Sequence, residues 1–298
     1  QKEIEVKYTW EDVTYDRNKH APKPEITVSA SEKDGLTVVY EITKNGVKVA
    51  GDGEKVTEAG EYVIKVSLEG TAAGNYKLVN AEYEFNINKV ALTVTAKDQT
   101  FDYGADAPEF TTDFATFEGL LADEADEVKA ALADVISQWF RCAYVNTTVP
   151  GEYKIYIDAA WLNEYLNNYE VTGVNGKLTV NPAEGALVWV GDGESGADFT
   201  YNGNANLPEA YYYDSTGRKH ELTVKLATYD EESGEYSVID GEAVNAGSYF
   251  AVIVDANGNV IKADGNYTFE NYGTAFKINK LEITVNVKDL QFTYGDVN

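Results

Sequence analysis

The chain repeats part of its own sequence, and this repeat constrains the fold more than any other feature. Residues 74–104 align without a gap on residues 265–295, and both stretches share Gly-Asn-Tyr, Phe-x-Ile-Asn-Lys, Lys-Asp and Phe-x-Tyr-Gly. Further upstream, residues 14–22 resemble residues 200–208, and residues 58–62 resemble residues 245–249. Self-similarity of this kind predicts small modules arranged in tandem.

The spacing of the repeat divides the chain into two types of module. We expect a first module at residues 1–88, its sister at 183–279, and a module of a second type at 89–182 between them. Residues 280–298 match only the first strand of a further module of the second type, so this last copy is truncated. A chain of 298 residues is long enough for several modules that each bury a core.

Short alternating stretches predict the secondary structure of these modules. Apolar and polar residues alternate over residues 36–50, 61–68 and 82–89, which is typical of half-buried strands. Asn45-Gly46 between two such stretches indicates a tight hairpin, because both turn residues need a positive φ. The 22 Tyr and 25 Gly also fit a β-protein. We therefore predict an all-β fold of tandem immunoglobulin-like β-sandwich modules in series.

One stretch of the second module has helical spacing instead. Val128, Leu132, Val135 and Trp139 form an apolar stripe opposite acidic residues. The stripe predicts a helix near residues 121–140 that covers an edge or an end of this sandwich. Residues 158–168 can form a second, short helix.

Charge and cysteine content exclude several classes of protein. Lys and Arg number 24 against 50 Asp and Glu, a formal net charge of −26, so no basic footprint exists for nucleic acid or for anionic lipid. No apolar run approaches the ~18 residues of a membrane span, and we expect no direct membrane insertion. A single cysteine, Cys142, excludes an intrachain disulfide framework and a CxxC zinc pattern.

Residues that could support catalysis have structural explanations. Neighbouring carboxylates such as Asp123 and Glu124 are expected by chance among 50 acidic residues and suit solvated turns. His20 and His220 do not lie in the sequence context of a nucleophile. We predict no catalytic residue, no cofactor and no enzymatic activity.

Two turns carry oxygen-bearing side chains that could bind calcium. The weak candidates are Asp255, Asn257 and Asn259 in one turn and Asp192 and Glu194 in the other. Such turns also have a purely conformational reason for Asp and Asn, because these side chains bond to nearby backbone amides. A structural calcium ion is therefore kept as an alternative to none.

Exposed aromatic side chains could instead bind carbohydrate, since the CH faces of sugars stack on rings. Tyr211, Tyr212 and Tyr213 are consecutive, and strand alternation turns some of them outward. Trp161 and Trp189 are further candidates for a glycan-binding surface.

The second module resembles the MBG domain of the YGX type. The resemblance is carried by Tyr103-Gly104, by the Pro-Gly-x-Tyr step at residues 150–153 and by the closing segment 167–182, and Tyr294-Gly295 begins the pattern again. The flanking modules resemble bacterial immunoglobulin-like repeats of surface adhesins, through Tyr-Asn-Gly, Ala-Gly-x-Tyr and Phe-x-Ile. The resemblance implies tandem all-β modules of secreted or wall-attached bacterial proteins.

These observations predict a non-enzymatic fragment of an extracellular bacterial surface protein, on the cell surface or cell wall, whose tandem sandwiches serve as a stalk or as adhesin repeats. Its partners would be a host or matrix glycan, a protein, or a second copy of the chain. The alternative is a set of carbohydrate-binding modules in a secreted or cell-surface glycan-degrading assembly. A third reading is a filament subunit that assembles by strand exchange through residues 280–298, since a lone strand is unstable by itself.

Overall fold

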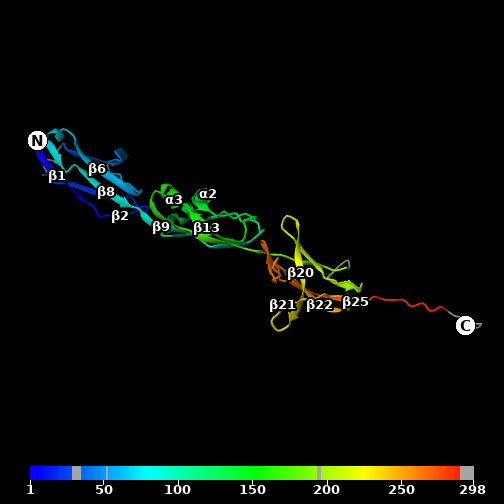
Figure 1. Ribbon diagram of the computed structural model, residues 1–298. Helices are drawn as coiled ribbons and strands as arrows, with labels where there is room; N and C mark the ends of the chain where they lie inside the picture. The colour runs from blue at the N-terminus through cyan, green and yellow to red at the C-terminus, as the bar shows by residue number, and fades with distance from the viewer. Residues whose placement is uncertain (29–34, 52, 193–195, 289–298) are drawn as a thin grey trace, which may run out of the picture. The chain divides into compact units, whose positions relative to one another are not determined.

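The computed structural model describes residues 1–28, 35–51, 53–192 and 196–288. Strands dominate it and confirm the all-β prediction (Figure 1). The chain forms two compact units, of which the first contains residues 1–100, 107–144 and 152–179. The second contains residues 101–106 and 145–151 and the chain from residue 180 onward. The module boundaries expected from the repeat stay predictions.

Residues up to 88 form two packed sheets. The larger sheet has the strand order β2-β8-β6-β4-β5 and the smaller one the order β3-β1-β7. Ile42, Ile64 and Ile87 are buried in the core of this sandwich. At the predicted hairpin, φ is 50° at Asn45 and 74° at Gly46, which confirms the turn. The elements are β1 (Lys2–Thr9), β2 (Val13–Thr14), β3 (Lys23–Ile26), β4 (Thr37–Lys44), β5 (Val47–Ala50), β6 (Gly60–Glu69), the 3-10 helix η2 (Ala73–Asn75), β7 (Tyr76–Val79) and β8 (Glu82–Asn88).

The following residues, up to 181, again form two sheets. One has the order β11-β9-β14 and the other the order β10-β15-β13-β12. Gly104, which lies two residues after the end of β10, has a φ of 86°, a backbone conformation that glycine adopts readily in turns. The strands are β9 (Val90–Ala96), β10 (Gln99–Asp102), β11 (Ala115–Glu118), β12 (Phe140–Arg141), β13 (Gly151–Ile157), β14 (Tyr169–Val174) and β15 (Gly176–Asn181). The helices are the 3-10 turns η3 (Thr112–Phe114) and η4 (Ala122–Glu124), and α1 (Ala125–Asp134), α2 (Ile136–Trp139) and α3 (Ala159–Tyr165).

The helical stretch is broken where the sequence predicts one continuous helix. The break falls at Val135, whose φ of −123° and ψ of 25° are not helical. The indole of Trp139 donates to the Leu132 carbonyl at 2.9 Å, an acceptor that an uninterrupted helix would offer to the Ile136 amide. Leu132 and Trp139 are fully buried, so the stripe covers the module core as expected, but through two short helices.

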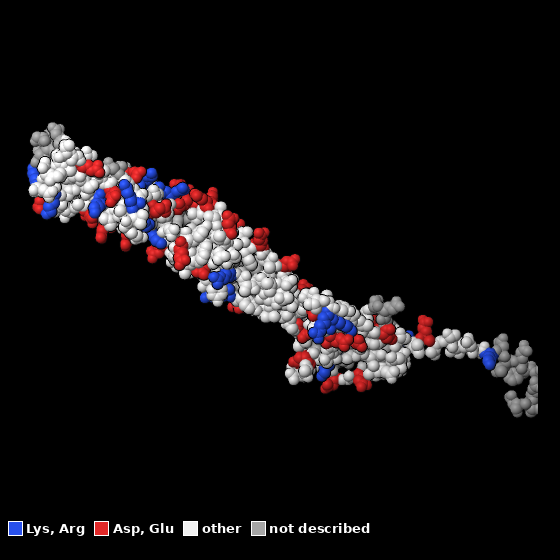
Figure 2. Space-filling model, turned by 90° about the horizontal axis from the view of Figure 1, so that it is seen from above, with Lys and Arg blue, Asp and Glu red and all other residues white. Residues whose placement is uncertain are grey.

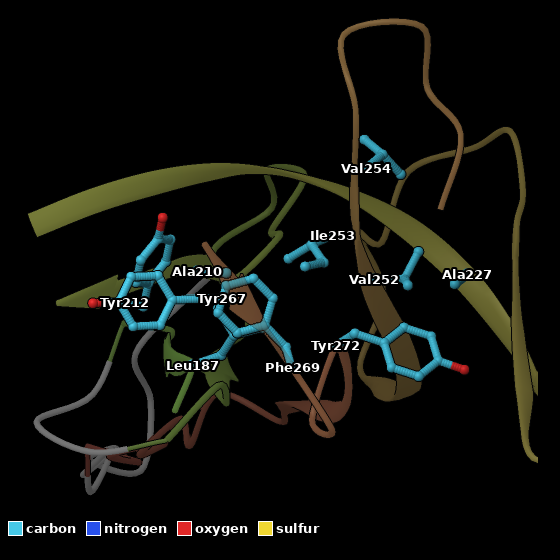
Figure 3. Packing of buried hydrophobic residues seen from close by; sticks show 10 residues of the cluster. All are labelled: Leu187, Ala210, Tyr212, Ala227, Val252, Ile253, Val254, Tyr267, Phe269 and Tyr272. Atoms are coloured by element: carbon cyan, nitrogen blue, oxygen red, sulfur yellow. The ribbon is translucent and has the colours of Figure 1, made fainter. Parts of the chain in front are cut away.

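The sister module forms the main sheet of the second unit. Its strand order is β17-β19-β20-β22-β25-β18, with β21 paired to β20, and a small sheet has the order β16-β24-β23. Figure 3 shows the aromatic core of this module, in which the Tyr212 and Tyr267 rings lie against each other beside Phe269. The strands are β16 (Ala183–Glu184), β17 (Val188–Val190), β18 (Phe199–Thr200), β19 (Glu209–Tyr213), β20 (Lys219–Asp230), β21 (Glu235–Val238), β22 (Gly247–Val254), β23 (Ala263–Asp264), β24 (Tyr267–Thr268) and β25 (Gly273–Asn279).

Strand registers repeat between the first module and its sister. Gly60 pairs with Ile87 in the first module, and Gly247 pairs with Ile278 in the sister. A tyrosine follows each of these glycines by two residues. The Tyr62 hydroxyl donates to the Glu58 carbonyl at 2.6 Å, and the Tyr249 hydroxyl donates to the Asn245 carbonyl at 2.8 Å. Both tyrosines thus bond to backbone four residues upstream, as in a tyrosine corner.

The segment after the sister module pairs with no strand among the described residues. Residues 280–288 are irregular, and their side chains are exposed. Leu281, Ile283, Val285 and Val287 present an alternating apolar row to solvent. The rest of the predicted strand, residues 289–298, lies outside the described residues.

Candidate functional site

The first module contains a groove with a volume of about 520 Å³. Strands β4, β6 and β8 and the segment between β1 and β2 supply its walls. The lining side chains combine aromatic rings with hydrogen-bonding groups: Trp10, Tyr62, Tyr83 and Phe85 among the rings, Asp12, Glu61 and Glu84 among the carboxylates, and Asn45 and Asn86 as amides. Rings beside carboxylates and amides can stack on the CH faces of a sugar and bond its hydroxyls.

Trp10 is the most unusual residue of this groove. Its ring packs edge-on against Phe85 with centroids 4.9 Å apart. The indole Nε1 is buried and has no hydrogen-bond partner within the described residues. A buried donor without an acceptor is costly, commonly about 1–3 kcal/mol, and such groups are rare in native structures. The Trp10 indole is thus a donor that the groove wall leaves unsatisfied.

The three consecutive tyrosines of β19 point to alternating faces. Tyr212 lies in the core, where its hydroxyl donates to Asp264 Oδ2 at 3.0 Å and its ring stacks on His220. Tyr212 therefore offers no ring face to a ligand. Tyr213 is 56% exposed, whereas Lys219 Nζ lies 4.2 Å from the centroid of the Tyr211 ring. Only Tyr213 presents a largely open ring here.

The two tryptophan candidates lie in different settings. Trp161 lies in the first turn of α3 and stacks on Tyr165 with ring centroids 4.7 Å apart, so the two rings cover each other on one side. Trp189 of β17 donates through its indole to the Asn271 carbonyl at 3.1 Å and packs on the sister-module core. Trp161 with Tyr165 forms a half-exposed aromatic pair, and Trp189 has a structural contact.

The Asp255 carboxylate serves the turn that contains it. Its Oδ2 accepts the Asn259 side-chain amide at 3.1 Å, and its Oδ1 accepts the backbone amides of Asn257 and Asn259, each at 2.8 Å. The side-chain bond and then the backbone bonds lower the pKa of the carboxyl. Asp192 Oδ2 accepts the Thr200 amide at 2.7 Å, and Glu194 lies outside the described residues. Among the described ranges, no three His, Cys, Asp or Glu side chains gather as a metal site. Calcium binding at these turns stays a prediction.

Both histidines pair with an aspartate in a turn. His20 Nε2 lies 2.7 Å from Asp16 Oδ1, and His220 Nε2 lies 2.8 Å from Asp214 Oδ2. Each aspartate also accepts backbone amides, Asn18 in the first case and Thr216 in the second. The bonds from Asn18 and His20 lower the pKa of Asp16 to about 2. These pairs stabilise turns at the surface.

A carboxylate joins the first module to the second within the first unit. Glu124, in η4, accepts hydrogen bonds from the hydroxyls of Tyr15 and Tyr169, the first at 2.9 Å. Arg17 Nε lies 3.6 Å from the same carboxylate, which is mostly buried. Tyr15 belongs to the first module, and Glu124 and Tyr169 belong to the second. Three donors from both modules thus converge on one negative charge.

Other bonds close the same junction. The Ala59 amide donates to Asn168 Oδ1 at 2.9 Å, and the Val90 amide donates to the Asn168 carbonyl at 3.0 Å. Leu121 and Val90 pack against the core of the first module. Burial and the nearby Glu124 charge raise the pKa of Tyr15 to about 12 and raise that of Tyr169 as well. Both hydroxyls therefore stay protonated and able to donate at physiological pH.

Acidic side chains are spread over the molecular surface. On the face seen in Figure 2 they occur in both units, with lysines and arginines between them. The described part of the chain includes no helix with the length and apolar character needed to span a membrane.

Comparison with known proteins places the second module in a family. Residues 92–179 match the family model of the MBG domain (YGX type), which confirms the resemblance read from the sequence. MBG domains occur in surface proteins. The adhesin-repeat resemblance of the flanking modules stays a prediction. No curated protein matches the chain.

Solved structures also match. One is the Bacteroides ovatus SGBP-B of a mixed-linkage glucan utilization locus, in complex with a mixed-linkage heptasaccharide, at 12% sequence identity and a TM-score of 0.18. The match covers 91% of this chain and 66% of that one. At this TM-score the likeness carries no argument about fold or ligand.

The groove was not found from the sequence, because its residues come from four separate strands and turns. Trp10 gave the one available signal, a tryptophan next to acidic residues in a short connection. The junction residues were equally hidden, since Tyr15 and Glu124 lie far apart in the sequence.

Proposed function

We propose that the chain is a non-enzymatic part of an extracellular bacterial surface protein, in which β-sandwich modules in series form a stalk or adhesin repeats. The MBG domain at residues 92–179 supports the surface location. The observation that carries the proposal is the closed junction between the first module and the MBG module. It is built on a mostly buried carboxylate rather than on a free linker.

A junction of this kind suits a load-bearing array. Separating the modules would expose Glu124 together with the apolar contacts of Val90 and Leu121. It would also break the bonds from Tyr15 and Ala59 in one step. Such a pair of modules resists bending at the joint, so its length is maintained under tension.

Single-molecule extension of the whole chain, held at its two ends, tests this role. If the chain is a stalk, the first module and the MBG module should stay joined under force until one of them unfolds. The Glu124→Ala variant should lengthen at lower force, because the joint opens first, whereas Glu127→Ala, on the same helical stretch, serves as the control. A native chain that extends freely at the joint would contradict the proposal. Antibodies against the chain should label intact bacteria that carry it.

Carbohydrate binding is the second candidate, and the groove around Trp10 favours it. The rings of Trp10 and Tyr83 and the polar Glu84 and Asn86 line one groove, whose surface is suited to stack on a sugar and to bond its hydroxyls. Asp12, Glu61 and Glu84 give the groove a negative charge. A neutral polysaccharide fits this charge, and an anionic one would be repelled.

A glycan array with the full chain separates the two candidates. Binding modules should retain neutral glycans and lose them on Trp10→Ala or Asn86→Ala, the second variant being the milder one for folding. Tyr213→Ala and Trp161→Ala, which change exposed rings elsewhere, are matched controls. If only the control variants lose binding, the glycan site lies at Tyr213 or Trp161. If the array retains no glycan, the result favours the stalk role.

A further inference from the structure

The sister module carries the same end surface that the MBG module covers on the first module. The Tyr15 amide donates to the Asn88 carbonyl at 2.8 Å, and the Tyr201 amide donates to the Asn279 carbonyl at 2.9 Å. Tyr201 therefore occupies the place of Tyr15. By the shared strand registers, Ala246 likewise occupies the place of Ala59.

This end is covered in the first module and open in the sister. Tyr15 is 6% exposed, while Tyr201 is 38% exposed. Ala59 is buried and Ala246 is exposed. Within the described residues, neither the Tyr201 hydroxyl nor the Ala246 amide has a hydrogen-bond partner, whereas their counterparts bind Glu124 and Asn168.

The segment that leaves this open end, residues 280–288, follows directly after β25 (Figure 1). Like the open end, it is not covered by another module among the described residues. Ile283, Val285 and Val287 align with Leu92, Val94 and Ala96 of β9, which are buried in the MBG module. Val285 is 76% exposed, and Val94 is fully buried. A row of apolar side chains whose counterparts are buried in a module core is thus exposed to solvent beside the open end.

We propose that the open end of the sister module, formed by Tyr201, Ala246 and Tyr249, is a docking surface for a second MBG module of the YGX type. Residues 280–288 supply the first strand of that module. In that second MBG module, the residue equivalent to Glu124 accepts a hydrogen bond from the Tyr201 hydroxyl, and the residue equivalent to Asn168 accepts one from the Ala246 amide. The docked module is thus identified by an acidic residue and an asparagine at those two positions of its fold.

The sister surface lacks one donor of the first module. Arg17, with a φ of 66°, is replaced by Gly203, with a φ of 79° in the same turn. Asp16 Oδ1 accepts the Asn18 amide in one turn, and Asn202 Oδ1 accepts the Asn204 amide in the other. The sister therefore offers the hydroxyl and the amide without the guanidinium. We expect its junction to be the weaker of the two. Gly203→Arg should strengthen it, because a β-carbon at Gly203 meets no atom within 4 Å, and the strain that a φ of 79° places on a side chain is the same with and without the docked module.

Extending the full chain tests the docking surface. Residues 108–182 are appended after Asn298, so that residues 280–298 become the start of a complete second copy of the MBG module. Hydrogen exchange is then compared between the extended and the 298-residue chains. The Ala246 amide should exchange at least about tenfold more slowly in the extended chain, because it gains an acceptor and is covered. Protection of the appended copy itself reports that it has folded.

Variants assign the protection to the proposed contacts. Tyr201→Phe should reverse most of it, Gly203→Arg should increase it, and Tyr213→Phe, an exposed tyrosine of the same module, should leave it unchanged. A folded copy that leaves Ala246 exchanging as before would overturn the proposal, as would a copy that stays unfolded. If a second copy of the chain covers this surface instead, the 298-residue chain should form a dimer, and removing residues 281–298 should abolish the dimer. This result would also overturn the proposal. The docking surface rests on the repeat and does not require the stalk role.

Discussion

The Tyr15 hydroxyl donates to Glu124 Oε2 at 2.9 Å, while the equivalent tyrosine, Tyr201, is left open. One fold position therefore occurs in the same chain both with and without its partner module. This pair of tyrosines gives each measurement on the junction an internal control.

Removing the Tyr15 hydroxyl should destabilise the first unit. A hydrogen bond to a charged group contributes about 1.5–3 kcal/mol, so we expect Tyr15→Phe to cost about 1–2 kcal/mol. Tyr201→Phe should change stability by less than about 0.5 kcal/mol, since its hydroxyl is exposed. Hydrogen exchange of the β2 and β8 amides in increasing urea measures both variants. Equal costs for the two changes would show that the junction bond contributes nothing.

Alkaline pH should loosen the same junction. The pKa of Tyr15 is raised to about 12 in the folded chain from a usual value near 10. A group with a raised folded pKa contributes stability below its unfolded pKa and loses it as pH rises through the folded one. Stability of the first unit should therefore fall between pH 10 and 12, and less steeply in Tyr15→Phe. Urea denaturation at a series of pH values measures the slope, and parallel curves for both proteins would contradict this assignment.

Trp139 should be the most sensitive residue of the MBG module. It is fully buried, packs on Phe117 and caps the Leu132 carbonyl at the helix break. Replacement by alanine opens a large cavity, so we expect Trp139→Ala to cost about 3–5 kcal/mol. Thermal melts of the full chain, with hydrogen exchange to locate the change, measure it. Trp161→Ala, at a half-exposed position, is the control and should have a smaller effect, and an unchanged melting midpoint for Trp139→Ala would argue against the covering role of α1 and α2.

The turn at Asp255 should hold its shape without calcium. Two backbone amides and the Asn259 side chain already occupy the Asp255 carboxylate. Exchange of the Asn257 and Asn259 amides should therefore be the same in calcium and in chelator, and faster in Asp255→Ala under both conditions. Slower exchange on adding calcium, abolished by Asp255→Ala, would instead establish a calcium site.

Local patterns predicted the local structure well. Asn45-Gly46 determines a hairpin through its own backbone preferences, and alternation over residues 61–68 and 82–89 places strands β6 and β8. The resemblance between residues 58–62 and 245–249 is matched in the structure, where Tyr62 and Tyr249 make the same contact, because equal sequence in an equal fold gives equal neighbours.

The helix and the aromatic candidates show where such reasoning stops. Helical periodicity describes which face of residues 121–140 is apolar, but it does not show the break at Val135, where the Trp139 indole bonds to the Leu132 carbonyl. Alternation predicts that the tyrosines of β19 differ in direction, and only packing against Asp264 and His220 shows that Tyr212 is the inward one.

The sequence by itself determined that the chain is built mainly of strands and repeats part of itself, since repeats, turns and alternation are read from neighbouring residues. The tertiary structure alone decided which carboxylate among the 50 acidic residues is mostly buried and bonded to two tyrosines. Glu124 is distinguished by burial and by donors from Tyr15 and Tyr169, which lie 109 and 45 residues away. Contacts over such separations depend on how modules pack together, and no local pattern encodes them.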